Sequence, residues 1–446
     1  MNNALYLEYQ SRVESNARSY PRRLPLAIVK AQGLRVTDAD GRVFIDCLAG
    51  AGALALGHNH PVVVDALRDH LASGLPMQTL DLMTPVKQRF VAELLATLPA
   101  SFAARARVQF CSPSGADAVE AAMKLVKTAT GRAPIWAMQG GFHGQTHGAL
   151  ALMGNLGPKR AVQGLMPGVQ SLPFPYSYRC ALGSSPCTDC RCADYMQSLL
   201  IDPESGALLP AAVITEVVQG EGGAIRASDD WLRRVRTMTR EHDVPLIFDE
   251  VQTGWGRTGR MYAFEHSGVV PDVLVLSKAI GGGLPLAVVV YDERLDLWKP
   301  GAHSGTFRGN QMAMTAGLAT LEYLRSNQLT AHADAMGVRF LANFAELEKQ
   351  DYVGEVRGTG LMLGIEIVDP LTLDGAGRPR GDGTLAARIQ AECFTRGLIV
   401  ELGGRHGAVI RMLPPLIVTA DEVDTICGIV AESCAAAART RMVASV

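Results

Sequence analysis

The stretch VPLIFDEVQTGWGRTGRMYAFEHSGVVPDVLVLSKAIGGGLPLAVVV, residues 244–290, decides the fold of this chain. It contains two apolar runs typical of buried strands, residues 244–248 and 273–276. The first run leads into Asp249, and the second leads into Lys278. Because the carboxyl ends of parallel strands meet at one ligand-binding edge of an open α/β sheet, we expect these two side chains to lie along the same edge.

A lysine at the end of a buried strand is unusual. Removing its ammonium from water is unfavourable unless it is paired or its pKa falls, so such a lysine is a candidate for reaction through a free amine. With Asp249 nearby, Lys278 also suits pyridoxal phosphate, since the amine would form a Schiff base and the acid would keep the ring nitrogen protonated. The alternatives are an amino group that reaches solvent and an ordinary Asp–Lys ion pair.

Size and charge limit the class of protein. The chain has 446 residues, which is enough for two or three domains at roughly 100–200 residues each. Its 42 basic and 44 acidic residues form no long run of one sign, so neither nucleic acid nor an anionic membrane is an expected partner. Residues 1–25 lack the apolar core of a secretory signal, and the apolar run near residues 279–290 is shorter than the roughly 18 residues that span a bilayer. We expect a cytoplasmic protein.

The nine cysteines fall into two groups. Five stand singly among apolar residues, where they look like small buried hydrophobic side chains: Cys47, Cys111, Cys393, Cys427 and Cys434. Four cluster in a segment rich in Pro, Gly and Ser: Cys180, Cys187, Cys190 and Cys192. Zinc or a disulfide would suit the clustering, but the spacing is too irregular for a ribbon or finger, and a reducing compartment argues against disulfides. We assign no metal, and the role of this cluster stays open.

The rest of the chain alternates strands and helices, which indicates a doubly wound α/β domain. Residues 26–46 predict a hairpin around Asp40–Gly41, and Pro61 is expected to open a helix. Beyond about residue 330, a long amphipathic helix, a further strand pair and another helix predict a smaller α/β domain.

A possible phosphate site lies at residues 112–117, SPSGAD, between a short strand and a helix that ends before Gly131. The helix begins with small residues only. Its free backbone amides, the Ser114 hydroxyl and the positive end of the helix dipole would suit a phosphate. An ordinary capped helix is the alternative.

Two further features lie after or within predicted strands. Phe142, flanked by glycines in residues 140–144, can lay its ring on a planar cofactor, although a single aromatic residue is more often part of a core. Glu216 interrupts the apolar run at residues 212–218, and an acid inside a buried strand needs a partner.

Together these motifs resemble the class III pyridoxal-phosphate aminotransferases, from about Gly33 to Leu416. The matching motifs are Ser114-Gly115-Ala116, Phe142-His143-Gly144, residues 216–223, Asp249-Glu250-Val251-Gln252, Ser277-Lys278 and Gly305-Thr306. The resemblance implies an α/β, type I aminotransferase fold, with a large domain built on a mostly parallel seven-stranded sheet and a smaller α/β domain formed by both chain ends. The corresponding parts are residues 1–78, which contribute to the small domain, residues 79–330, the large cofactor-binding domain, and residues 331–446, the C-terminal small domain. A homodimer with active sites at its interface is also implied, and further pairing of dimers stays open.

The resemblance also implies roles for individual residues. Lys278 would hold the cofactor and move a proton, and Asp249 would pair with the ring nitrogen. The remaining cofactor-binding residues would be Gln252 at the phenolic oxygen, Phe142 and Val251 on the ring faces, Ser114, Gly115, Ala116 and Thr306 of the partner subunit at the phosphate, and His143 and Glu216 beside them. Arg411 would bind a substrate carboxylate, and Glu221 would pair with it when no carboxylate is present. Without the resemblance, Arg411 reads as a surface arginine.

Residues 48–61, 80–90, 114–132, 141–155 and 303–314 look most like diaminobutyrate 2-oxoglutarate aminotransferases. These enzymes move the 4-amino group of L-2,4-diaminobutanoate to 2-oxoglutarate, giving aspartate 4-semialdehyde and glutamate. The alternatives are aminotransferases of the ornithine, acetylornithine, 4-aminobutyrate or lysine type, an aminomutase or epimerase, and a protein that binds the cofactor without turnover.

Two positions depart from the family pattern. Gln145 stands where many relatives that act on 4-aminobutyrate or ornithine have arginine. A neutral amide cannot neutralise a distal carboxylate, so the group that holds the second carboxylate of 2-oxoglutarate is not identified. Val217 stands where relatives often have proline, a change expected to affect only local backbone stiffness.

Overall fold

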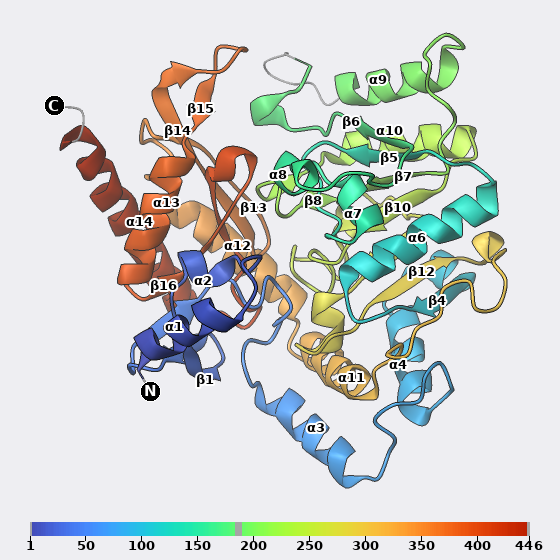
Figure 1. Ribbon diagram of the computed structural model, residues 1–446, viewed down its shortest axis with the longest axis horizontal. Helices are drawn as coiled ribbons and strands as arrows, with labels where there is room; N and C mark the ends of the chain where they lie inside the picture. Colours follow the sequence, from blue (N-terminus) through green and yellow to red (C-terminus); the bar gives the residue numbers. More distant parts are fainter. Residues whose placement is uncertain (1, 183–189, 444–446) are drawn as a thin grey trace.

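The structure, a computed structural model, describes residues 2–182 and 190–443. Figure 1 shows the two ends of the chain, coloured blue and red, gathered on one side of the molecule. The large sheet and α6 (Gly115–Thr130) occupy the other side. The segments at the two ends of the sequence therefore fold together.

The large sheet has seven strands in the order β4-β12-β11-β10-β7-β5-β6. Only β12 runs antiparallel to its neighbours, so the prediction of a mostly parallel seven-stranded sheet is confirmed. The strands are β4 (Ala106–Phe110), β5 (Ile135–Met138), β6 (Val169–Leu172), β7 (Ala212–Thr215), β10 (Leu246–Asp249), β11 (Val273–Leu276) and β12 (Val288–Asp292). The first strand predicted in residues 244–290 begins two residues later than expected and includes Asp249 as its last residue.

Both faces of this sheet are covered. Ile247 and Val275 belong to an apolar cluster with residues of α6 and of α7 (His147–Leu152). Phe248 and Leu274 point the other way and belong to the cluster that contains Trp231 of α10 (Asp229–Glu241). Because both faces are buried, the strands read as continuous apolar runs rather than as alternating patterns.

Two smaller sheets join the chain ends. One has the order β1-β2-β3-β16, and its β16 (Leu398–Ile399) pairs in parallel with β3 (Val43–Asp46). The hairpin predicted around Asp40–Gly41 is confirmed, since β2 (Arg35–Asp38) pairs antiparallel with β3, while β1 (Ile28–Gln32) pairs with β2. The other sheet has the order β13-β14-β18-β17, with β15 paired to β14. Its strands are β13 (Val353–Thr359), β14 (Met362–Leu373), β15 (Pro379–Gly381), β17 (Glu401–Gly403) and β18 (Val409–Met412).

Two helices begin or end as their local residues predict. Pro61 opens α3, and α6 ends at Gly131, whose φ of 66° is left-handed. The α-helices not yet given are α1 (Asn3–Val13), α2 (Tyr20–Arg23), α3 (Pro61–Ala72), α4 (Pro85–Leu95), α5 (Ala100–Ala103), α8 (Leu156–Arg160), α9 (Cys190–Ile201), α11 (Gln311–Ser326), α12 (Leu329–Asn343), α13 (Gly383–Thr395) and α14 (Ala420–Val443).

Shorter elements connect these helices and strands. They are the ribbon of β8 (Val218–Gln219) and β9 (Ile225–Arg226) and the 3-10 helices η1 (Ser177–Arg179), η2 (Ala263–His266), η3 (Lys278–Gly281), η4 (Glu293–Leu295) and η5 (Arg405–Gly407). Across residues 2–182 and 190–443, no helix combines the length and the apolar character that crossing a membrane requires.

The five single cysteines behave as predicted. They are free thiols with buried side chains: Cys47, Cys111, Cys393, Cys427 and Cys434. In the predicted cluster, Cys180 and Cys192 are also buried. Cys187 and the side chain of Cys190 lie outside the described residues.

Candidate active site

The predicted site residues converge because five strands of the large sheet end at one edge. Ala137, Ile214, Ile247 and Val273 lie level across β5, β7, β10 and β11. Val288 of β12 pairs with both Leu276 and Phe110, so β11 and β4 also end level. The loops that follow these strands carry nearly all the residues expected to bind the cofactor.

Lys278 begins η3, two residues after the end of β11. Its φ of 52° is left-handed, a backbone conformation that costs a non-glycine residue about 1–3 kcal/mol and that is concentrated at functional sites. Within the described part of the chain, no hydrogen bond or ion pair holds its Nζ. Burial lowers the pKa of this amine, the nearby charge of Glu221 opposing the shift and that of Arg411 adding to it. The structure therefore positions a lysine with an available amine.

Asp249 is buried at the end of β10, the strand that pairs with β11 and so lies next to the strand preceding Lys278. Its Oδ2 lies 2.8 Å from His143 Nδ1, and its Oδ1 accepts a hydrogen bond of 3.0 Å from the Val251 amide. Burial would lower the pKa of His143, but the hydrogen bond and the charge of Asp249 outweigh it and raise that pKa. His143 therefore orients and supports the carboxylate, which is a positioning role.

Glu216 has the partners that its burial requires. Its Oε1 accepts from the Phe142 amide at 2.8 Å and its Oε2 from the Gly220 amide at 2.9 Å. Burial raises its pKa to about 7, although the charge of His143 and these two amides oppose the shift. Glu216 thus fixes the two loops that carry Phe142 and Glu221, and both of its oxygens are bound to backbone.

The first turn of α6 begins at the predicted phosphate site. The Ser114 hydroxyl accepts from the Asp117 amide, and the Ser114 carbonyl accepts from Ala118. The amides of Gly115 and Ala116 belong to the first turn and have no intrahelical acceptor. A Cβ on Gly115 would lie 2.9 Å from Val251 Cγ1, so Val251 lies directly against this helix end.

Arg411 is a buried residue of β18, and not the surface arginine of the alternative interpretation. Its Nη1 lies 2.7 Å from Glu221 Oε1, and its Nη2 donates to Gln252 Oε1 at 3.1 Å. The charge and hydrogen bond of Arg411 outweigh burial and lower the pKa of Glu221. The predicted Arg–Glu pair is present beside Lys278, which also contributes to lowering that pKa.

Gln252 has contacts that the sequence did not suggest. Besides the bond to Arg411, its Nε2 donates to the Ala51 carbonyl at 3.1 Å. Ala51 lies in the glycine-rich passage after β3 and has a left-handed φ of 57°. Gln252 therefore joins that passage to the Arg411 pair.

Three other positions that the sequence singled out are not fully buried. Phe142 is partly buried, and Gln145 is exposed. Thr306 is also exposed, and its carbonyl accepts from Gln78 Nε2 of the same chain. Within one chain, Thr306 is open to contact from outside.

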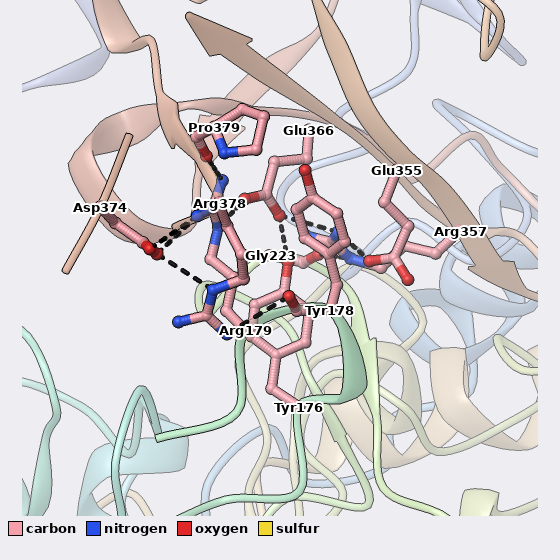
Figure 2. Close-up of polar contacts among 10 residues, drawn as sticks. All are labelled: Tyr176, Tyr178, Arg179, Gly223, Glu355, Arg357, Glu366, Asp374, Arg378 and Pro379. Atoms are coloured by element: carbon pink, nitrogen blue, oxygen red, sulfur yellow. Dashed lines mark hydrogen bonds and ion pairs between the residues drawn. The ribbon is translucent and has the colours of Figure 1, made fainter. Parts of the chain in front are cut away.

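A buried charge network supports the loop that carries Glu221 (Figure 2). Glu366 of β14 accepts from Tyr176, Arg179 and Arg357. Arg357 Nε also donates to the Gly223 carbonyl at 2.8 Å. The charges of Arg357 and Arg179 outweigh burial and lower the pKa of Glu366. This network joins the segment after β6, the β13–β14 hairpin and the loop at residues 220–223, and no sequence motif indicated it.

Sequence reasoning also missed residues of the N-terminal segment. Arg23 of α2 lies 3.1 Å from Glu401 of β17, and Glu401 is the strand neighbour of Arg411. The charges of Glu401, Glu221 and Arg411 all act on the pKa of Tyr20, which burial raises. The N-terminal segment thus contributes side chains next to the Arg411–Glu221 pair.

Comparison with known proteins places this geometry in context. Residues 16–433 match the family described as aminotransferase class-III. The chain is 56% identical over 432 residues to a diaminobutyrate--2-oxoglutarate aminotransferase of Rhizobium meliloti (strain 1021), with 96% of this chain and 92% of the relative covered. It is 50% identical to the protein of the same name from Haemophilus influenzae, with 92% and 90% covered. Among solved structures, a PLP-bound amine transaminase from an uncultivated Pseudomonas species is similar with a TM-score of 0.83 and 30% identity, covering 95% of this chain and 98% of that one.

Proposed function

The chain belongs to the class III aminotransferases and is a pyridoxal-phosphate-dependent enzyme, and from this premise we propose that it acts on L-2,4-diaminobutanoate. The 4-amino group is transferred to 2-oxoglutarate, giving aspartate 4-semialdehyde and glutamate. The identity to two relatives named for this reaction supports the choice of substrates. The observation that carries the proposal is the ion pair of buried Arg411 with Glu221 beside Lys278, because it can serve two substrates of different charge in one pocket.

The residues of the site fit pyridoxal phosphate. The amine of Lys278 is not engaged by any described residue, a buried acid lies on the neighbouring strand, and two first-turn amides of α6 are available to a phosphate. Lys278 would hold the aldehyde end, Asp249 the ring nitrogen and Gln252 the phenolic oxygen. The phosphate would be held by Ser114, Gly115, Ala116 and Thr306 of the partner subunit, and the ring by Phe142 and Val251. The cofactor supplies an aldehyde that carries the amino group and a ring that accepts electrons.

The protein's own groups supply proton transfer and charge. Because burial lowers the pKa of Lys278, more of this amine is neutral near pH 7 than for an exposed lysine, and a neutral amine can take a proton from the reacting carbon. The Val251 amide and His143 fix the two oxygens of Asp249, so this carboxylate would be held in place to balance the charge of the ring nitrogen.

The Arg411–Glu221 pair exchanges partners between the two half-reactions. When 2-oxoglutarate or glutamate binds, its carboxylate next to the reacting carbon takes the place of Glu221 on Arg411. When diaminobutanoate reacts through its 4-amine, no carboxylate lies there and Glu221 neutralises the arginine. Buried Arg411 is therefore paired in both states, and the displaced Glu221 carboxylate, whose side chain is 37% exposed, can be solvated.

The proposal includes a homodimer in the cytoplasm. Apolar side chains are unusually exposed near the Thr306 segment, which supports an interface there: Met77 is 60% exposed, Leu82 67%, Met83 69% and Phe307 65%. The five free buried thiols suit a reducing compartment.

The test is an amine-donor panel with product identification. Purified enzyme with pyridoxal phosphate and 2-oxoglutarate should form equal amounts of glutamate and aspartate 4-semialdehyde from L-2,4-diaminobutanoate. Its kcat/KM should exceed those for ornithine, 4-aminobutyrate and lysine. A higher value for one of those donors would replace the proposed substrate, and turnover of diaminobutanoate without any 2-oxo acid would indicate an isomerase instead.

A further inference from the structure

A second arginine–glutamate pair lies next to the first. Arg23 Nη1 is 3.1 Å from Glu401 Oε1, and the Glu401 side chain is only 5% exposed. Glu401 and Arg411 are directly opposed in the antiparallel pairing of β17 with β18, so their side chains lie on the same face of the sheet. Two arginines and two acids therefore share one region of the site.

Glu401 is incompletely satisfied. Its Oε2 is buried and has no hydrogen-bond partner among the described residues. A buried carboxylate oxygen without a donor is costly, and an arrangement of this kind is expected where a ligand supplies the missing donor. Burial raises the pKa of Glu401, with the charges of Arg23 and Arg411 opposing it.

Arg23 is also within electrostatic reach of the reacting centre. Its charge adds to those of Arg411 and Lys278 in lowering the pKa of Glu221. The side chain of Arg23 is 39% exposed, so it contacts both the buried acid and solvent. This position suits a cation that meets the outer end of a bound substrate.

The proposed substrates require a second binding group, away from the reacting carbon. Arg411 accounts for one carboxylate of 2-oxoglutarate, and the exposed amide of Gln145 cannot neutralise the other. L-2,4-diaminobutanoate that reacts at its 4-amine presents an ammonium and a carboxylate at its other end. The distal subsite must therefore bind a carboxylate in one half-reaction and an ammonium together with a carboxylate in the other.

We propose that Arg23 and Glu401 form this distal subsite, an inference that rests on the proposed function. Arg23 binds the carboxylate remote from the reacting carbon in both substrates. Glu401 is the counter-ion of Arg23 between substrates, and its Oε2 accepts a hydrogen bond from the 2-ammonium of diaminobutanoate. The pair thereby accepts dicarboxylates and diamino acids without a change of fold.

The Arg23 variant tests the carboxylate half. Arg23→Gln should lower kcat/KM for 2-oxoglutarate by about tenfold or more, through KM, because a charge-assisted pair to the distal carboxylate is lost. Pyruvate has no distal carboxylate, so its kcat/KM, measured in single turnovers, should change by less than about threefold. An equal loss for both acceptors would mean that Arg23 only anchors the N-terminal segment, and would overturn the proposal.

Arg22 provides the matched control. It lies beside Arg23 in α2, but its guanidinium donates to the Arg18 and Asn16 carbonyls, away from Glu401. Arg22→Gln removes the same charge from the same short helix. It should leave the ratio of kcat/KM for 2-oxoglutarate to kcat/KM for pyruvate unchanged. A ratio that fell as far as in Arg23→Gln would assign the effect to net charge and refute the subsite.

The Glu401 variants test the ammonium half. Glu401→Gln should raise KM for diaminobutanoate by about tenfold while KM for 2-oxoglutarate stays within about threefold, since only the diamino acid carries the ammonium. If Arg23→Gln alone is unstable because Glu401 is left unpaired, the Arg23→Gln/Glu401→Gln double variant has no unpaired charge and should still lose the preference for 2-oxoglutarate. A double variant with the wild-type preference refutes the proposal.

The two proposals fail differently. The kcat/KM values for 2-oxoglutarate and pyruvate can be measured with any amine donor that the wild-type enzyme accepts. If the wild-type enzyme does not turn over diaminobutanoate, the proposed function is refuted. If the variants keep the wild-type ratio of kcat/KM for 2-oxoglutarate to kcat/KM for pyruvate, the distal subsite is refuted.

Discussion

Lys278→Ala is expected to lower the rate of transamination by at least about 10³-fold, because it removes the amine that we propose holds the cofactor and moves the proton. The fold should survive. Alanine retains the Cβ and the backbone at φ 52°, and the substitution removes a buried amine that no described residue bonds. Steady-state kinetics with diaminobutanoate and 2-oxoglutarate, together with a melting curve, measure the two effects separately.

Lys127 serves as the control for this substitution. It is also a lysine whose pKa burial lowers, but it lies in the last turn of α6, at the opposite end of that helix from Gly115. Lys127→Ala should keep activity within about threefold, as expected for a side chain that contacts no reacting group. Wild-type turnover by Lys278→Ala, or equal losses in both variants, would contradict the assignment of Lys278.

Asp249→Asn is expected to lower kcat by about 10²–10³-fold, because it removes the preorganised charge that we propose pairs with the ring nitrogen, while preserving shape. It should also lower the pKa of His143. The Asp249 carboxylate is what raises that pKa against burial, so the imidazole of the variant should lose its proton at a lower pH than in the wild type. Kinetics and an NMR titration of His143 measure these two results.

Glu250→Gln is the matched control. Glu250 follows Asp249 and is equally buried, but its oxygens accept from the Ala263 and Phe264 amides and the Thr253 hydroxyl. Its replacement should reduce stability by about 1–3 kcal/mol and leave kcat within a few-fold. If Asp249→Asn had the kcat of Glu250→Gln, Asp249 would be a structural acid and the proposed role would be wrong.

Local sequence patterns predicted many of the helices and strands that position the site. The run at residues 273–276 gave β11 with its observed bounds, since a short uninterrupted run of β-branched and aliphatic residues is typical of a buried parallel strand. Gly131 predicted the end of α6 because only glycine adopts the left-handed cap without strain. The convergence of Asp249 and Lys278 followed from the geometry of parallel strands alone.

Contacts made across long sequence separations could not be predicted in this way. Glu401 faces Arg411 through strand register, and Arg23 reaches Glu401 only after both chain ends have folded together. The partners of Glu216 are backbone amides, and because every residue except proline has one, the residue types do not predict them. The left-handed backbone of Lys278 is likewise set by its surroundings, because lysine itself does not favour it.

The central claim is that Lys278 is the residue that holds pyridoxal phosphate. Reduction of the holoenzyme with borohydride fixes the cofactor permanently to its lysine, and peptide mapping by mass spectrometry then locates it. The account predicts one modified peptide, the one that contains Lys278, with the modification lost if L-2,4-diaminobutanoate is added before the reductant. A cofactor mass on any other lysine, with the Lys278 peptide unmodified, would contradict the account.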